Sequence, residues 1–125
     1  MLETSATEPR YDQIPPAGWE AFFDALSKSL QGTRTEIEVL DLGIGDQIQV
    51  EWAPLNGLGY DRKDDTFWVY IDLGDKHLDH AIPHPREILT RIGGAGLEEV
   101  IAVDADRAKH IIRLRAPVML PPHEE

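Results

Sequence analysis

The segment at residues 77–85 holds the densest group of side chains that could do chemistry. Its three histidines, His77, His80 and His84, are spaced i, i+3 and i+7, and Asp79 lies among them. Imidazole and carboxylate groups are suitable ligands for zinc, nickel or iron. A helix would place all three rings on one face, but the prolines on both sides of His84 oppose a helix there. The segment therefore indicates either a metal site, with His80, His84 and Asp79 as candidate ligands, or histidines with ordinary roles in a loop and a strand.

Basic side chains gather near the C-terminal end of an otherwise acidic chain. The pattern at residues 110–115 predicts a strand with Arg113 and Arg115 on one face and apolar residues on the other. These arginines could pair across the sheet with the glutamates at positions 36 and 38 or at 98 and 99. They could also dock an acidic partner. Together with His84, Arg86 and Glu87, they form the interaction surface that the sequence predicts.

Other reactive patterns lack a fitting context. The turn at residues 61–65 is acidic, but it also contains Arg62 and Lys63, which is typical of a solvated loop and not of a catalytic carboxylate pair. The glycine clusters at residues 43–45 and 93–96 lack the lysine and the serine or threonine of a phosphate-binding loop. No serine has the context of a nucleophile elbow. We therefore expect no cofactor and no serine hydrolase chemistry.

One helix and a series of strands must position these residues. In residues 17–31 the large apolar side chains recur with helical spacing, which predicts an amphipathic helix that ends at Gly32. Beyond Gly32 the period changes from 3.6 to 2, which is typical of short strands. Residues 66–71 are apolar on both faces, so we expect this strand to be central or covered. The pattern predicts an α+β fold with an N-terminal helix packed on a curled antiparallel sheet of about five or six short strands, open or closed into a small barrel.

The composition describes one acidic globular domain. The chain has 125 residues, with 12 lysines and arginines and 23 aspartates and glutamates, so its formal net charge is −11. We expect an irregular arm at residues 1–16, a single domain at 17–120 and a tail at 121–125. No apolar run approaches the roughly 18 to 20 residues that cross a bilayer. The negative charge and the absence of cysteine favour a cytoplasmic protein and disfavour nucleic acid or membrane partners.

A set of residues between Trp19 and Leu120 follows a pattern that occurs together in one family. The matching positions are Gly45, Asp46, Gln47, Glu51, Trp52, Tyr60, Asp61, Asp64, Asp65, Asp79, His80, His84, Pro85, Arg86 and Glu87. With these residues the chain resembles a family of small, single-domain bacterial and archaeal proteins that is catalogued only as a domain of unknown function. The resemblance implies a compact single domain and brings no activity, ligand or catalytic residue. His77 lies outside the pattern, which leaves His80 and His84 as a pair.

The same residues suggest a spatial relation between two segments. If the tip of the turn at residues 61–65 folds over the following strand, His84 and its neighbours Arg86 and Glu87 lie beside Asp64 and Asp65. Paired charges at these positions would form a polar surface.

These observations favour a non-enzymatic protein-binding or regulatory module. We expect it to act through residues 79–87 and the arginine face, on a protein partner or on a second copy of the chain, with self-association through a sheet edge or through residues 66–71. One alternative is a metal-binding protein or small metal-dependent enzyme that uses the ligands named above. A third interpretation is a small-ligand-binding β-barrel whose pocket is lined by Trp52, Trp68 or Tyr70.

Overall fold

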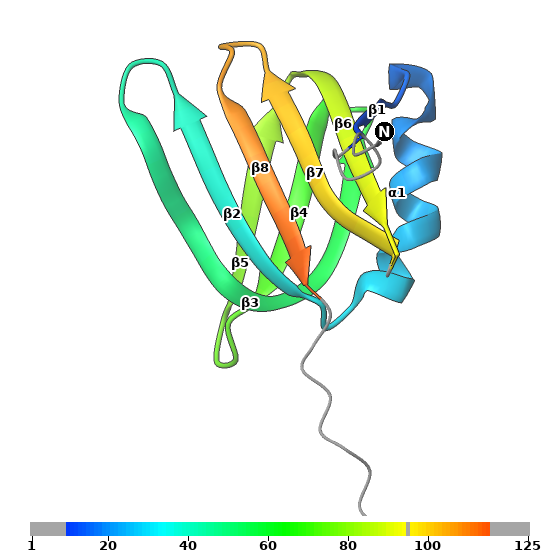
Figure 1. Ribbon diagram of the computed structural model, residues 1–125, viewed down its shortest axis with the longest axis vertical. Coiled ribbons are helices and arrows are strands. Elements are labelled where there is room, and N and C mark those ends of the chain that lie inside the picture. Colours follow the sequence, from blue (N-terminus) through cyan, green and yellow to red (C-terminus); the bar gives the residue numbers. More distant parts are fainter. Residues whose placement is uncertain (1–9, 95, 116–125) are drawn as a thin grey trace, which may run out of the picture.

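The computed structural model describes residues 10–94 and 96–115, and these residues form one antiparallel sheet of eight strands with one α-helix (Figure 1). The elements are β1 (Asp12–Gln13), the 3-10 helix η2 (Pro16–Gly18), α1 (Trp19–Ser27), the 3-10 helix η3 (Lys28–Leu30), β2 (Arg34–Asp41), β3 (Gly45–Asp61), β4 (Thr66–Asp72), β5 (His77–Pro83), β6 (Pro85–Gly93), β7 (Gly96–Asp104) and β8 (Lys109–Arg115). Within the described ranges no helix has the length and apolar character needed to cross a membrane.

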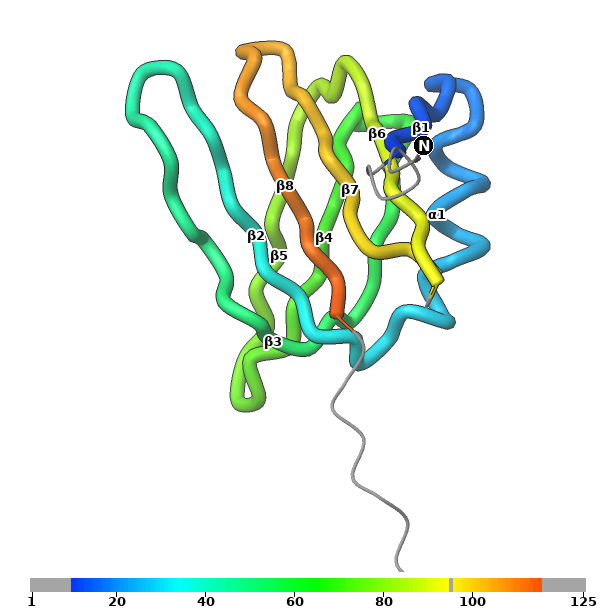
Figure 2. Tube along the Cα trace, viewed as in Figure 1, coloured from blue at the N-terminus to red at the C-terminus, as the bar shows by residue number. Residues whose placement is uncertain are grey.

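The sheet bends sharply along β3, its longest strand. Strand order is β1-β6-β7-β8-β2-β3-β4-β5. Residues 45–54 of β3 pair with β2, whereas residues 55–61 pair with β4. The bend divides the sheet into a front layer, from β1 to the first half of β3, and a back layer of the second half of β3, β4 and β5 (Figures 1 and 2).

The core lies between the two layers. Alternate residues of the strands point inward, and side chains such as Ile37 and Ile112 from the front layer and Phe67 and Val69 from the back layer have no exposed surface. Helix α1 packs against β3. Its buried Phe23 contacts the ring of Phe67, with centroids 4.7 Å apart. The aromatic stripe of the predicted helix therefore closes one side of the core.

The observed α-helix is shorter than the helix that the apolar pattern predicts for residues 17–31. α1 ends at Ser27, and the chain continues as η3 to Leu30. Gly32 has a φ of +84°, the left-handed conformation that the C-cap prediction requires. The strand at residues 66–71 is expected from its sequence to be central or covered. In the structure it is central in the back layer, between β3 and β5. Its Trp68 and Tyr70 lie on the outer face and stack on each other, with ring centroids 6.0 Å apart.

The sheet itself differs from the prediction in two ways. It has eight strands in the described residues instead of about five or six, and it is not closed, so the barrel alternative is wrong. The strands without a counterpart in the prediction are β1, β5 and β6. β5 and β6 carry histidine, charged residues and proline, which hide the period of 2 from a hydrophobicity pattern. β1 falls in the arm predicted to be irregular, and the tail predicted at 121–125 lies outside the described residues.

Removal of the Phe23 ring should test the contact between helix and sheet. Because this side chain is fully buried, Phe23→Ala should lower the free energy of unfolding by about 3 to 5 kcal/mol. Phe22→Ala, at a half-buried position on the same helix, should cost about 1 to 2 kcal/mol. Urea unfolding followed by circular dichroism measures both values, and equal losses would contradict this packing.

Candidate functional site

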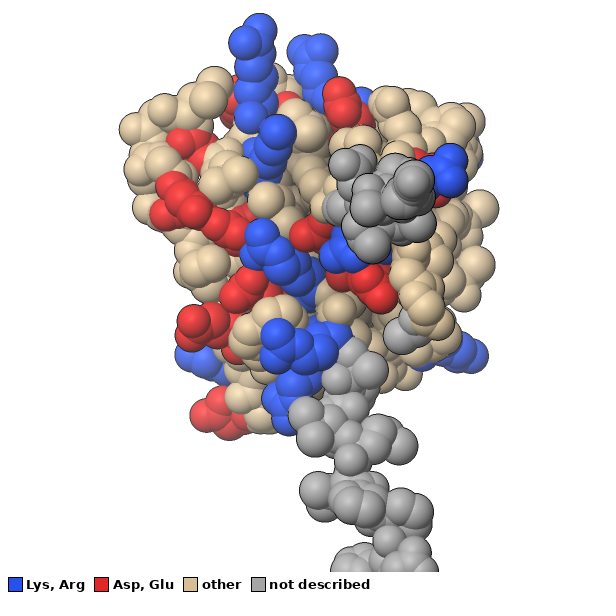
Figure 3. All heavy atoms as spheres, viewed as in Figure 1, with Lys and Arg blue, Asp and Glu red and all other residues tan. Residues whose placement is uncertain are grey.

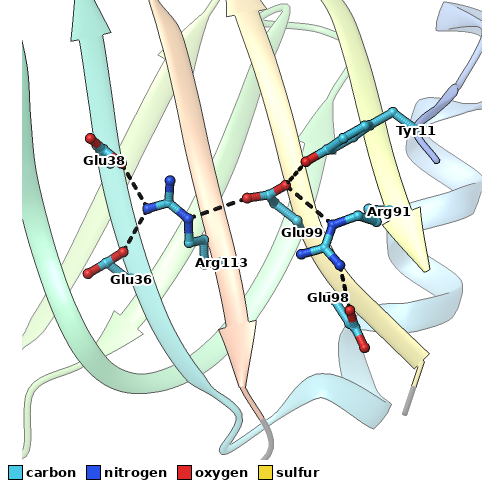
Figure 4. A network of polar contacts seen from close by, with 7 residues as sticks. All are labelled: Tyr11, Glu36, Glu38, Arg91, Glu98, Glu99 and Arg113. Atoms are coloured by element: carbon cyan, nitrogen blue, oxygen red, sulfur yellow. Dashed lines mark hydrogen bonds and ion pairs between the residues drawn. The ribbon is translucent and has the colours of Figure 1, made fainter. Parts of the chain in front are cut away.

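A ladder of charged side chains crosses the outer face of the front layer (Figure 4). Arg91 on β6 lies opposite Glu99 on β7, and Glu99 lies opposite Arg113 on β8. Arg113 in turn lies opposite Glu36 on β2. Nη1 of Arg113 is 2.7 Å from Oε1 of Glu36 and 2.8 Å from Oε1 of Glu38. Charges of alternating sign therefore neutralise one another across four strands.

Glu99 occupies the centre of the ladder, and its side chain is only 8% exposed. Its carboxylate lies 3.4 Å from Nε of Arg113 and 3.6 Å from Nε of Arg91, and it accepts a hydrogen bond from the hydroxyl of Tyr11. The last contact raises the pKa of Tyr11. Arg91 also donates to Glu98 at 2.6 Å. Two guanidinium groups and a hydroxyl surround this carboxylate and compensate for its burial.

The sequence left two roles open for the arginines of β8, and the structure shows pairing within the chain for Arg113. Figure 3 shows the resulting mixture of basic and acidic groups over this face. The predicted interaction surface is divided, because His84, Arg86 and Glu87 lie where β6 begins and Arg115 lies where β8 ends. The five residues do not form one patch.

A chain of hydrogen bonds joins two histidines between the layers. Nε2 of His80 on β5 lies 3.0 Å from Nδ1 of His110 on β8, and Nε2 of His110 lies 2.9 Å from Oδ2 of Asp104. Asp104 also accepts the backbone N–H groups of Asp106 and Ala108. Although burial raises the pKa of this carboxyl group, the hydrogen bond from His110 and the two backbone bonds outweigh it and hold the pKa below its usual value.

These contacts set the positions of the protons on the two rings. A carboxylate can only accept, so Nε2 of His110 carries a proton, and in the neutral form of this ring Nδ1 accepts a hydrogen bond from Nε2 of His80. Nδ1 of His80 is then left with a lone pair. Burial lowers the pKa of His80 to about 4, with a smaller contribution from the nearby His110, so the ring stays neutral at neutral pH. Asp104 orients the ring of His110, as the aspartate does in a catalytic triad, but the other nitrogen of this ring meets His80 and not a nucleophile.

The expected proximity of residues 84–87 to the turn at residues 61–65 is confirmed for one pair, His84 and Asp65. Nδ1 of His84 is 3.1 Å from Oδ2 of Asp65, and Tyr60 donates its hydroxyl to Oδ1 at 2.6 Å. The two hydrogen bonds, the one from Tyr60 first, lower the pKa of Asp65. Both His84 and Asp65 have positive φ angles, of 50° and 49°, and their backbones share a hydrogen bond of 2.7 Å. The pair therefore links the connection between β5 and β6, where the chain passes from the back layer to the front layer, to the β3–β4 turn.

The candidate metal ligands do not come together. Asp79 and His80 are neighbours in β5 and so point to opposite faces, while His84 contacts Asp65. The described residues contain no group of three or more histidines or acids placed to hold a metal ion. His80 instead contacts His110, thirty positions away in the chain, a pairing that no local sequence pattern indicates.

The β2–β3 hairpin combines an unpaired strand edge with exposed apolar side chains. Figure 2 shows the hairpin at one margin of the front layer. None of the described strands pairs with the second side of residues 45–54, since β4 begins its pairing at Leu55. Leu42 is 81% exposed, Ile44 is 70% exposed and Ile48 is 48% exposed. An edge of this kind offers backbone donors and acceptors to another strand.

Comparison with known proteins places this fold in a family. Residues 10–123 match the model of a "Family of unknown function (DUF5335)". The chain belongs to this family. An uncharacterized protein from Aquifex aeolicus (strain VF5) is 41% identical over 108 residues, which make up 86% of this chain and 95% of that relative. No solved structure matches the chain. The resemblance noted in the sequence is thereby confirmed.

Sequence reasoning missed two features of this DUF5335 member. The contact of His80 with His110 depends on how the two layers stack, which no spacing in the chain shows. The free edge had a local signal: residues 35–61 contain no lysine or arginine, and the hairpin turn carries two large aliphatic residues, Leu42 and Ile44. Charged residues, lysine above all, are a common protection of sheet edges.

Loss of the Arg113 guanidinium should destabilise the front layer. Arg113→Met leaves Glu36, Glu38 and Glu99 without their shared cation, so we expect a loss of about 2 to 4 kcal/mol in the free energy of unfolding. Arg62→Met removes an exposed ion pair with Glu20 and should change it by less than about 1 kcal/mol. Chemical unfolding at low and high salt checks both, and similar small losses would argue against the ladder.

The low pKa of His80 should make stability depend on pH. In the unfolded chain the ring binds a proton near pH 6.5, whereas the folded protein keeps it neutral down to about pH 4. The unfolded state thus binds more protons in this window, and the free energy of unfolding should fall by about 2 to 3 kcal/mol as pH drops from 6.5 to 4. His80→Gln should remove this contribution.

Urea unfolding at a series of pH values measures the slope. His77→Gln, an exposed position on the same strand, is the matched control and should keep the wild-type slope. If wild type and His80→Gln showed the same slope between pH 4 and 6.5, His80 would not be the group responsible.

Proposed function

We propose that this protein is a protein-binding module that takes up an extended segment of a partner along the free edge of β3. The observation that carries the proposal is the one-sided pairing of residues 45–54 beside the exposed side chains of Leu42 and Ile44. Addition of a strand would satisfy the unpaired backbone groups and bury these side chains. The proposal keeps the protein-binding module favoured by the sequence and moves its contact surface from residues 79–87 and the arginine face to the hairpin.

Over residues 45–53 the edge lacks lysine and proline, two of the common protections that keep strands apart. Proteins commonly protect an exposed edge with lysine, with proline or by covering it. Within residues 45–53 there is neither lysine nor proline, and the large aliphatic side chain of Ile48 is half exposed. Exposed leucine and isoleucine on a polar, acidic protein favour a site that is covered when a partner binds.

The charge of the hairpin indicates the chemistry of the partner. Between residues 35 and 53 its ionisable side chains are all acidic: Glu36 and Glu38, which pair with Arg113, and Asp41, Asp46 and Glu51. A hydrogen bond with Glu38 raises the pKa of Asp46, because two carboxyl groups lie together there. A cation placed beside them would relieve their repulsion. The partner segment should therefore be extended, apolar on one face and basic on the other, and a second acidic copy of this chain fits less well.

Binding of designed peptides tests the proposal. A ten-residue peptide that alternates valine and lysine should bind, and its affinity should fall with added salt, because both the edge and the acidic groups contribute. The matched peptide with glutamate in place of lysine should bind at least about tenfold more weakly. Fluorescence anisotropy of labelled peptides measures both affinities.

Variants locate the binding site. Ile48→Lys places a cation on the edge and should abolish binding of the lysine peptide, whereas Leu73→Lys, at an exposed apolar position in the β4–β5 turn, should leave it unchanged. Amide exchange should slow at residues 46–52 in the complex. Equal affinity for both peptides, or equal effects of the two variants, would contradict strand addition at this edge.

A further inference from the structure

Two arginines are held against Trp52 at the point where β3 bends. The guanidinium carbon of Arg115 lies 3.9 Å from the centre of the Trp52 ring. Nη1 of Arg34 donates to the carbonyl oxygen of Trp52 at 3.3 Å. Trp52 has a φ of 47°, a conformation that is uncommon for a bulky aromatic residue and that often marks a functional site.

The two arginines also lie directly opposite each other, Arg34 on β2 and Arg115 on β8. Like charges in this position destabilise a sheet. Among the described residues no carboxylate lies within ion-pair distance of either, although Arg62, Arg91 and Arg113 each have one. On a chain with a net charge of −11, this is a local excess of positive charge that a bound anion would neutralise.

A groove begins at the same place. It has a volume of about 750 Å³, and both Trp52 and Arg115 line it. Its aliphatic wall consists of Leu26, Leu30, Leu97 and Leu114. The other ionised groups of the groove are Arg91, Arg113, Glu98 and Glu99, which pair with one another or with other residues of the ladder. Their charges are thus already balanced, and in the described part of the groove the uncompensated charge is that of Arg115 and the adjacent Arg34.

We propose that Arg34, Arg115 and Trp52 bind the head group of an amphiphilic oxyanion, a phosphate or a carboxylate, whose aliphatic body lies along the leucines of the groove. Guanidinium groups bind both kinds of oxyanion through charged hydrogen bonds. The volume is within the range of small-molecule sites, and the leucines and the charged side chains of the lining offer separate surfaces to the two parts of such a ligand. The proposal is independent of strand addition at the hairpin.

Thermal unfolding with four additives tests the two parts of the ligand separately. Below its micelle concentration, octyl phosphate should raise the melting temperature by about 4 °C at ten times its dissociation constant. Octanoate distinguishes a carboxylate from a phosphate head, since the preferred head should give the larger shift. Inorganic phosphate and octanol, each with one half of the ligand, should give clearly smaller shifts than the better amphiphile.

Variants connect the effect with the arginines. Arg34→Gln and Arg115→Gln should each weaken binding of the better amphiphile at least about tenfold, as expected for loss of a charged hydrogen bond. Arg86→Gln, an exposed arginine where β6 begins, is the control and should bind as the wild type does. Without ligand, Arg34→Gln should unfold at the wild-type temperature or above it, because the substitution removes a repulsion; this shows that the variant is folded.

Three outcomes would overturn the proposal. If neither amphiphile shifts the melting temperature, there is no such site. If octanol acts as strongly as the amphiphiles, the groove binds apolar molecules without the arginines. If inorganic phosphate acts as strongly as octyl phosphate, the leucines take no part. None of these outcomes bears on peptide binding at the hairpin, which the peptide experiment tests separately.

Discussion

The change of pairing partner along β3 is the constraint on which the remaining structure depends. A single strand of 17 residues pairs with β2 in its first half and with β4 in its second. The positive φ of Trp52 and the register shift near Leu55 allow the turn between the halves. Because the strand bends, the two layers face each other and enclose a core. The same bend leaves the first half of β3 without a second neighbour, so the free edge is a direct consequence of the fold.

Charge is distributed according to the same plan. An acidic chain cannot place carboxylates on a packed sheet face without partners, and the ladder through Glu99 and Arg113 provides them. Within the described residues the cations of the ladder are Arg91 and Arg113, in the middle of the front layer. Acidic side chains remain at the hairpin, and Arg34 and Arg115 remain at the other end of β2. The proposed partner segment and the proposed oxyanion have opposite charges for this reason.

Much of the fold follows from periodicity, and the parts that do not follow have physical causes. The stripe from Trp19 to Leu30 predicts the helix, alternation predicts strands such as β8, which buries one face, and the apolar run at residues 66–71 predicts β4. In β5 the burial of successive residues alternates but their hydrophobicity does not, because a histidine lies beside leucine on its inner face. The pairing of His84 with Asp65 follows from adjacent segments, whereas that of His80 with His110 depends on the stacking of layers and has no counterpart in local sequence.

Both proposed sites lie on one strand, and this has a thermodynamic consequence. The free edge comprises residues 45–54. Trp52, whose ring lies against the guanidinium of Arg115, belongs to that stretch. A partner strand beside residues 45–54 and an oxyanion beside Trp52 would order the same backbone. If one ligand changes the free energy of the bend, it changes the affinity for the other ligand. The second ligand must then change the affinity for the first by the same factor, because the coupling between two binding sites is reciprocal. The strained φ of Trp52 is the element through which such coupling would act, since it is the point where the two halves of β3 meet.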